Sequence, residues 1–293
     1  MRLFPALVVL AAAVTGAPSP SGAADAPSKI ERIVSVGGSV TEILYVLGLQ
    51  DRIVAVDTTS FYPPAATKKP NVGYLRALAA EPIIAMNPSL IIADGDAGPP
   101  AVLDQISGAG VPLVIAPKEK TLDAAFEKLA VVAKAVGREA DGKAIEAAMR
   151  RDLAVVAKAV AGIEKKPRVL FLLSIGRSSP MAGGAKTSAD TIIGLAGGIN
   201  AAAGFEKYKQ IPLEGMVALA PDVILVTERS LEALGGVDKL LARTEIAATP
   251  AGKNRRLIAM NGLLMLGFGP RTGQAARMLA EKLHPGLRIG DGG

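Results

Sequence analysis

Two residues in the first third of the chain have the types and the spacing for binding a ferric ion. Tyr74 and Arg76 lie two positions apart in the segment 71–76, which reads NVGYLR. A phenol keeps its proton up to about pH 10 in water, but ferric iron can displace that proton, and a neighbouring guanidinium stabilises the resulting phenolate. A loop tyrosine that packs or donates a hydrogen bond without binding metal is the simpler alternative. Spacing alone leaves both open.

A second feature is a glutamate that leads the same short pattern in each half of the chain. Glu81 and Glu214 each begin a helix-like turn, which Pro88 closes in the first copy and Pro221 in the second, and an aliphatic run follows. Proline ends a helix, and such a run is typical of a buried strand. The repetition predicts two similar lobes with a ligand cleft between them. The alternative is chance similarity between two ordinary helix–turn–strand units, whose first-turn carboxylates the helix dipole favours.

Catalytic motifs and the usual zinc sites find little support in the sequence. The chain has one histidine, His284, and no cysteine, so both a usual zinc site and a Ser-His-Asp triad lack residues. The segment 183–187 resembles a phosphate loop but has no glycine directly before Lys186, and 267–273 misses the dinucleotide fingerprint by one position. We therefore expect a binding protein and no enzyme. An exported α/β enzyme acting on a carboxylate or phosphate substrate is the alternative from another class.

Strands and helices alternate in both halves of the chain, which predicts parallel α/β sheets. Aliphatic runs predict strands at 32–36, 52–56, 90–93, 112–115, 168–173, 223–226 and 256–260. Helices are expected at 189–196 and 270–283. In the first half, Ser39 with Glu42 three residues later predicts a capping box that opens a helix, and Gly48 ends that helix.

Two long amphipathic helices are expected between the two sets of strands. Apolar residues recur at helical spacing over 121–136 and 142–161. About 20 helical residues make a rod near 30 Å long, which is enough to cross from one lobe to the other. The sequence thus predicts an α/β fold of two lobes with central parallel sheets, residues 25–120 and 164–293. One long helix of the region 121–163 joins them.

Residues 1–24 have the composition of a signal peptide. Arg2 precedes a short apolar stretch, and the small residues Gly22 and Ala24 suit cleavage after Ala24. No later run is long and apolar enough to span a membrane, and a lipid anchor would need a cysteine at the cleavage site. The net charge of +6 is spread along the chain without a basic run that aromatics interrupt, so nucleic-acid binding fits poorly. We expect an exported protein that is not inserted in the membrane.

Several segments together resemble one family. The stretches 57–66 and 72–81, with 180–183, 234–237 and 266–272, are similar to the periplasmic haemin-binding proteins of bacterial haem ABC importers. The specific parts are the tyrosine–arginine segment and the Gly-Phe-Gly-Pro-Arg run at 267–271. The α/β pattern itself is shared with cobalamin and siderophore binders, so a binding protein for cobalamin or a ferric siderophore is the closest alternative.

This resemblance implies Rossmann-like lobes bridged by one long helix, with haem as the transported ligand in the cleft. Tyr74 matches the axial iron ligand of the family, and Arg76 matches the arginine that supports it. Glu81 and Glu214 match the glutamates, one on each lobe, that dock onto arginines of the membrane permease. Some relatives add a histidine from the second lobe as a second iron ligand, and the corresponding loop here, 174–178, has none.

The resemblance also implies partners and a location. Arg177 and Arg229 follow second-lobe strands and are candidates for pairing with the haem propionates, although simple solvent exposure would explain them equally well. The expected partner is the permease dimer of an ABC transporter in the inner membrane. The protein itself is expected to be a monomer in the periplasm.

Overall fold

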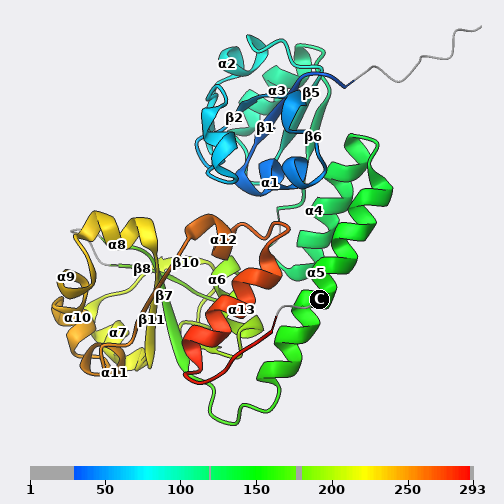
Figure 1. Cartoon of the computed structure of the whole chain (residues 1–293). Coiled ribbons are helices and arrows are strands. Elements are labelled where there is room, and N and C mark those ends of the chain that lie inside the picture. Colours follow the sequence, from blue (N-terminus) through cyan, green and yellow to red (C-terminus); the bar gives the residue numbers. More distant parts are fainter. Residues whose placement is uncertain (1–29, 119, 176–179, 291–293) are drawn as a thin grey trace, which may run out of the picture.

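The computed structural model describes residues 30–118, 120–175 and 180–290, which fold into two α/β lobes (Figure 1). The first lobe, at the top of Figure 1, is built on a four-stranded sheet, and the second lobe, at the lower left, on a six-stranded sheet. The expected α/β fold of two lobes with a helical connection is confirmed. The predicted signal peptide, residues 1–24, lies outside the described residues.

The main sheet of the first lobe is parallel throughout, in the order β2-β1-β5-β6. Its strands are β1 (Ile33–Val36), β2 (Ile53–Val56), β5 (Leu90–Ala93) and β6 (Leu113–Ile115). β1 and β5 are buried along their whole length, as expected for aliphatic central strands of a sheet that is covered on both faces. The remaining elements are α1 (Gly38–Val46), the 3₁₀ helices η1 (Gln50–Arg52) and η2 (Pro64–Lys68), the hairpin strands β3 (Gly73–Tyr74) and β4 (Ala77–Leu78), α2 (Ala80–Ile84) and α3 (Pro100–Gly108).

The sheet of the second lobe has the order β10-β8-β7-β11-β12, with β9 also beside β7. Its centre is parallel, as predicted, since β9 and β11 run parallel to β7 and β12 runs parallel to β11. At one edge, β8 runs antiparallel to β7, and β10 runs antiparallel to β8. The strands are β7 (Arg168–Ser174), β8 (Met181–Gly183), β9 (Ile199–Asn200), β10 (Tyr208–Gln210), β11 (Val223–Thr227) and β12 (Leu257–Met260). The helices are α6 (Ser188–Leu195), α7 (Leu213–Leu219), α8 (Glu228–Leu234), α9 (Val237–Leu241), α10 (Thr244–Ala247), α11 (Pro250–Lys253), α12 (Gly262–Leu266) and α13 (Thr272–Leu283).

Two helices packed side by side connect the lobes. α4 (Leu122–Ala135) begins at Thr121, whose hydroxyl accepts a hydrogen bond from the backbone N–H of Ala124, and it packs on α1 of the first lobe. α5 (Glu139–Val160) packs on α4 and then along α13 and α6 of the second lobe. The Arg150 guanidinium of α5 stacks 3.8 Å from the centroid of the Phe126 ring of α4. The connection is therefore a helix pair in which α5 is the long member.

The predicted capping box at the start of α1 is wrong. Gly37, with φ +108°, precedes the helix, and no side chain caps it. Ser39 and Glu42 lie inside the helix and are buried. The reason is tertiary: α1 begins against the second lobe, where a Cβ on Gly38 would lie 2.7 Å from the Leu263 side chain. The two polar side chains therefore bond to residues that are distant in sequence.

The repeated sequence pattern is a repeated structure. α2 and α7 each carry a glutamate in the first turn, and each leads into a buried central strand, β5 or β11. β5 lies between β1 and β6, and β11 lies between β7 and β12. The two units thus occupy equivalent positions in the two sheets.

Along the described ranges, the structure has no helix that combines the length and the apolar character needed to cross a membrane.

Candidate functional site

The β3–β4 hairpin carries Tyr74 in its first strand and Arg76 in its turn. Tyr74 pairs with Ala77 across this hairpin, so that Leu75 and Arg76 form its tight turn. Leu75 O accepts a hydrogen bond from Gly98 N (2.8 Å), and Leu78 N donates to Gly98 O (2.9 Å). The hairpin is therefore fastened, through its turn and its second strand, to the loop that follows β5.

Arg76 donates to both the tyrosine and a carboxylate. Its Nη1 lies 2.8 Å from Tyr74 Oη, and its Nη2 lies 2.7 Å from Asp96 Oδ2. Partial burial lowers the pKa of Arg76, but the hydrogen bonds to Tyr74 and Asp96 outweigh this effect, and the pKa is raised overall. Tyr74 is 42% exposed, so a ligand can reach its hydroxyl.

A buried ion pair lies directly behind this site. Lys128 Nζ of α4 lies 2.8 Å from Asp94 Oδ2 and 2.8 Å from Ser39 Oγ. Lys120 Nζ bridges Asp94 (3.4 Å) and Asp96 (3.3 Å). Burial raises the pKa of Asp94, but Lys128 and Lys120 outweigh it and hold that pKa well below its ordinary range.

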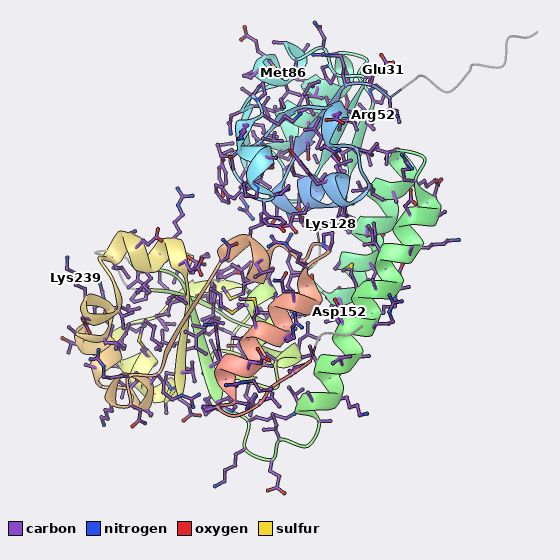
Figure 2. The ribbon with its side chains drawn as sticks, in the orientation of Figure 1. Glu31, Arg52, Met86, Lys128, Asp152 and Lys239 are labelled. Carbon is purple, nitrogen blue, oxygen red and sulfur yellow. The ribbon has the colours of Figure 1, made fainter. Side chains whose placement is uncertain are left out.

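Several contacts join the two lobes beside these residues. Lys128 also donates to Gly267 O of the second lobe (3.3 Å), and Figure 2 places it where α4 passes between the lobes. Arg271, which precedes α13, donates to both carboxylate oxygens of Glu42 (3.0 and 2.5 Å) and stacks 3.4 Å from the centroid of the Tyr62 ring. Burial raises the pKa of Glu42 despite the opposing effect of Arg271. These contacts fix one side of the interlobe junction.

The second lobe presents an arginine and a tyrosine toward the first. Arg229 of α8 is exposed, and its guanidinium lies 5.9 Å from the centroid of the Phe61 ring of the first lobe. Tyr208 of β10 lies within electrostatic range of Arg76 and Asp96, and burial raises the pKa of Tyr208 while Arg76 opposes that rise. Arg229 therefore lies in a helix, on a face of the second lobe that is close to the first lobe. Arg177 lies outside the described residues.

The two repeat glutamates lie on the outer ends of the lobes. Glu81 and Glu214 are exposed in the first turns of α2 and α7. Within residues 30–118, 120–175 and 180–290, neither carboxylate has a hydrogen-bond or ion-pair partner. A shallow, mainly apolar groove adjoins Glu81 and is lined by Leu78, Ala79, Ala80, Ile84, Ala85, Val102 and Gln105.

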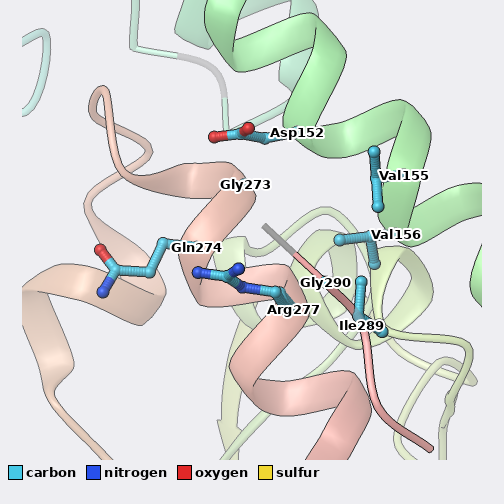
Figure 3. A pocket seen from close by; sticks show the side chains of 8 residues that line it. All are labelled: Asp152, Val155, Val156, Gly273, Gln274, Arg277, Ile289 and Gly290. Atoms are coloured by element: carbon cyan, nitrogen blue, oxygen red, sulfur yellow. The ribbon is translucent and has the colours of Figure 1, made fainter. Parts of the chain in front are cut away.

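A separate pocket of about 220 Å³ lies between α5, α13 and the segment after α13 (Figure 3). It is lined by Asp152, Val155, Val156, Gly273, Gln274, Arg277, Ile289 and Gly290. Of the predicted binding and docking residues that the structure describes, none lines it. The single histidine, His284, is half-buried, with Nε2 3.1 Å from Ala196 O. No group of three histidine, cysteine or carboxylate side chains in the described part of the chain could hold a metal ion.

Sequence reasoning missed the polar residues that surround Tyr74 and Arg76. Asp96 follows the buried strand β5 within an Asp-Gly-Asp run, and polar residues at the carboxyl ends of parallel strands are a usual mark of a site. That signal was available. Glu42 and Arg271 are 229 positions apart in the sequence, so no local pattern predicts that they pair.

Comparison with known proteins places the fold in a family. The family model described as "Periplasmic binding protein" matches residues 33–262. The chain belongs to this family. Its members are binding proteins, so the expectation of a binding protein and no enzyme is confirmed, and the alternative of an exported enzyme is set aside.

One solved structure resembles the chain over most of its length. The periplasmic heme-binding protein RhuT from Roseiflexus sp. RS-1, solved in apo form, is 42% identical with a TM-score of 0.85. The match covers 88% of this chain and 99% of RhuT. The resemblance to periplasmic haem-binding proteins that the sequence indicated is thereby confirmed.

Two curated relatives bear on the transporter and on the ligand. An uncharacterized ABC transporter substrate-binding lipoprotein, YvrC of Bacillus subtilis (strain 168), is 26% identical over 258 residues, 87% of this chain and 80% of YvrC. The vitamin B12-binding protein of Yersinia pestis (strain Pestoides F) is 39% identical over 83 residues, which is 28% of this chain and 30% of that protein. The similarity to the vitamin B12 binder is therefore confined to part of the chain.

Proposed function

We propose that this protein binds haem between its two lobes and delivers it to an ABC importer in the inner membrane. The observation that carries the proposal is the hydrogen bond from Arg76 Nη1 to the exposed Tyr74 hydroxyl, 2.8 Å long. An arginine in this position stabilises the phenolate form, which is the form that binds ferric haem iron. The full-length similarity to the heme-binding protein RhuT supports the same ligand.

The residues around Tyr74 suit the ring system and the propionates of a haem. Phe61 and Tyr62 are exposed aromatic side chains on the first lobe, available for stacking on a flat apolar ring system. Arg229, across from Phe61, offers a guanidinium to a propionate. We propose the same role for Arg177, which lies outside the described residues. Tyr74 is the axial iron ligand in this proposal.

A ligand titration tests the proposed cargo. The mature protein is titrated with ferric haemin, with cyanocobalamin and with a ferric siderophore, and absorption is followed at each addition. We expect saturable one-to-one binding of haemin and no saturation by the other two. Saturable binding of cobalamin instead would favour the alternative that the partial similarity to the vitamin B12-binding protein supports.

We further propose that Glu81 and Glu214 dock the loaded protein on the permease dimer. Both carboxylates are exposed, and the groove beside Glu81 adds an apolar surface to its charge. One carboxylate per lobe fixes the orientation of the bound protein as well as attracting a basic surface. We propose that the protein is a periplasmic monomer with a leader of 24 residues, lobes 25–120 and 164–293, and a helical connection 121–163.

Charge reversal tests the docking surface separately from ligand binding. The variant Glu81→Arg/Glu214→Arg keeps its affinity for haemin but no longer stimulates ATP hydrolysis by the importer in proteoliposomes. Glu127→Arg, at an exposed position on α4, is the matched control and leaves stimulation intact. Undiminished stimulation by the double variant would remove the two glutamates from the docking surface.

A further inference from the structure

Asp96 is the second acceptor of the Arg76 guanidinium. The two nitrogen atoms at the tip of Arg76 are each engaged, Nη1 by Tyr74 Oη and Nη2 by Asp96 Oδ2 at 2.7 Å. The Arg76 side chain is 55% exposed, whereas that of Asp96 is 17% exposed. A long exposed arginine loses rotamer entropy when it is held in one geometry, so a fixed acceptor decides where its guanidinium points.

The loop that carries Asp96 supplies this fixed acceptor. Asp96 N donates to Asp94 Oδ1 (3.1 Å), and Asp94 is in turn held by the buried Lys128. Ala97 N donates to Asp94 O (2.8 Å), which closes the turn around Asp96. Lys120 Nζ lies 3.3 Å from the same Asp96 Oδ2 that Arg76 contacts. The Lys120 backbone is itself held, because Thr191 Oγ1 of the second lobe donates to Lys120 O (2.8 Å). The carboxylate is therefore anchored on several sides, while Arg76 is anchored by that carboxylate.

We infer that Asp96 is a positioning residue for the iron ligand, which directs Arg76 onto Tyr74 Oη and so sets how strongly the phenolate donates to haem iron. This inference rests on the proposed function of Tyr74 as the axial ligand. A hydrogen bond to the phenolate oxygen withdraws electron density from it and makes its deprotonated form more available. Among the described residues, no hydrogen bond joins Asp96 to Tyr74, so Asp96 acts on Tyr74 through Arg76.

Loss of the carboxylate therefore has two measurable consequences. In Asp96→Ala, Arg76 is free to leave Tyr74, so the phenolate donates more strongly and its charge-transfer band to ferric iron moves to longer wavelength. The phenolate without this hydrogen bond is also more readily protonated, which breaks its bond to iron, so haemin dissociates faster, by about two- to fivefold, the range expected for a partly exposed ion pair. Asp96→Glu, which can still reach the guanidinium, restores both properties toward those of the unmodified protein.

A double-variant cycle with Arg76 separates positioning from other roles. We expect Arg76→Ala to shift the band and the dissociation rate in the same direction as Asp96→Ala, and the double variant to match Arg76→Ala alone. Asp104→Ala, an exposed carboxylate on α3 of the same lobe, is the matched control and changes neither readout. Asp96→Asn keeps the shape of the loop and serves where Asp96→Ala does not fold.

Two results would overturn the inference. One is an unchanged charge-transfer band in both Asp96→Ala and Asp96→Asn, while Tyr74→Phe and Arg76→Ala still alter it. The other is an equal effect of Asp96→Ala with and without Arg76, because Asp96 would then act independently of it. If Tyr74→Phe itself leaves the band unchanged, the assignment of the iron ligand fails, and the role of Asp96 fails with it.

Discussion

Asp94 and Asp96 stand two residues apart on the loop after β5, and each pairs with a basic side chain in a different environment. The Asp94 side chain is 9% exposed and its partner Lys128 is 1% exposed. The Asp96 side chain is 17% exposed and its partner Arg76 is 55% exposed. The buried pair also binds the first turn of α1 and a backbone carbonyl of the second lobe. The open pair instead contacts the exposed hydroxyl of Tyr74 and the ammonium group of Lys120.

One loop therefore serves two purposes through its two aspartates. A buried ion pair that loses one partner leaves an uncompensated charge in a medium of low dielectric constant, so it is costly to break and suits a structural junction. An exposed pair contributes little to stability, so its geometry is available for binding a ligand. The loop thus joins the lobes through Asp94 and serves the proposed iron site through Asp96.

The largest expected effect comes from removing the buried cation. Lys128→Met leaves Asp94 buried beside Lys120 alone, and we expect a loss of about 3 kcal/mol in the free energy of unfolding. Urea denaturation followed by circular dichroism measures it, and Lys134→Met, exposed on the same helix, is the control. A variant as stable as the control would show that the buried pair does not hold this junction.

Acid should weaken the same pair. The pKa of Asp94 is held well below the ordinary value of an aspartate in the folded protein, so the unfolded chain binds a proton at a higher pH than the folded protein. The stability that Asp94 contributes is therefore present above about pH 4 and is lost as pH falls below it, by on the order of 1–2 kcal/mol. The stability difference between the unmodified protein and Asp94→Asn should narrow between pH 6 and pH 3. A difference that stays constant over this range would contradict the role of Asp94.

The smallest effect on stability is expected at the open pair. Arg76→Ala should weaken haemin binding by about tenfold, the loss typical of one hydrogen bond to a charged group. The melting temperature of the ligand-free protein should stay unchanged, since an exposed arginine adds little to folding. Titration and thermal unfolding on one preparation measure both. A fall in melting temperature comparable with that of Lys128→Met would erase the distinction between the two pairs.

The backbone of both lobes was predictable because local patterns determine it. Aliphatic runs such as that of β5 have one stable environment, the centre of a covered sheet, and Thr121 begins α4 as a capping residue should. The side-chain pairings were less accessible. Ser39 and Glu42 have the spacing of a capping box, yet Glu42 bonds to Arg271 because the second lobe packs on the start of α1. Contacts made by folding the two lobes together leave no local signature.

The centre of the candidate site was predictable from the sequence, but a residue at its edge was not. Tyr74 and Arg76 are close in sequence, and a tight hairpin brings their functional groups together as the spacing indicated. Asp96 comes from a different loop, so its contact with Arg76 depends on the hydrogen bonds that fasten the hairpin to Gly98. These bonds belong to the tertiary structure.

The most direct test of the proposed function is resonance Raman spectroscopy of the ferric haem complex with and without the Tyr74 hydroxyl. We expect phenolate vibrations enhanced by excitation in the charge-transfer band of the unmodified protein and their complete loss in Tyr74→Phe, together with weaker haemin binding. Phenolate vibrations that persist in Tyr74→Phe would move the iron ligand to another tyrosine. A haem complex without phenolate vibrations in the unmodified protein would contradict the account.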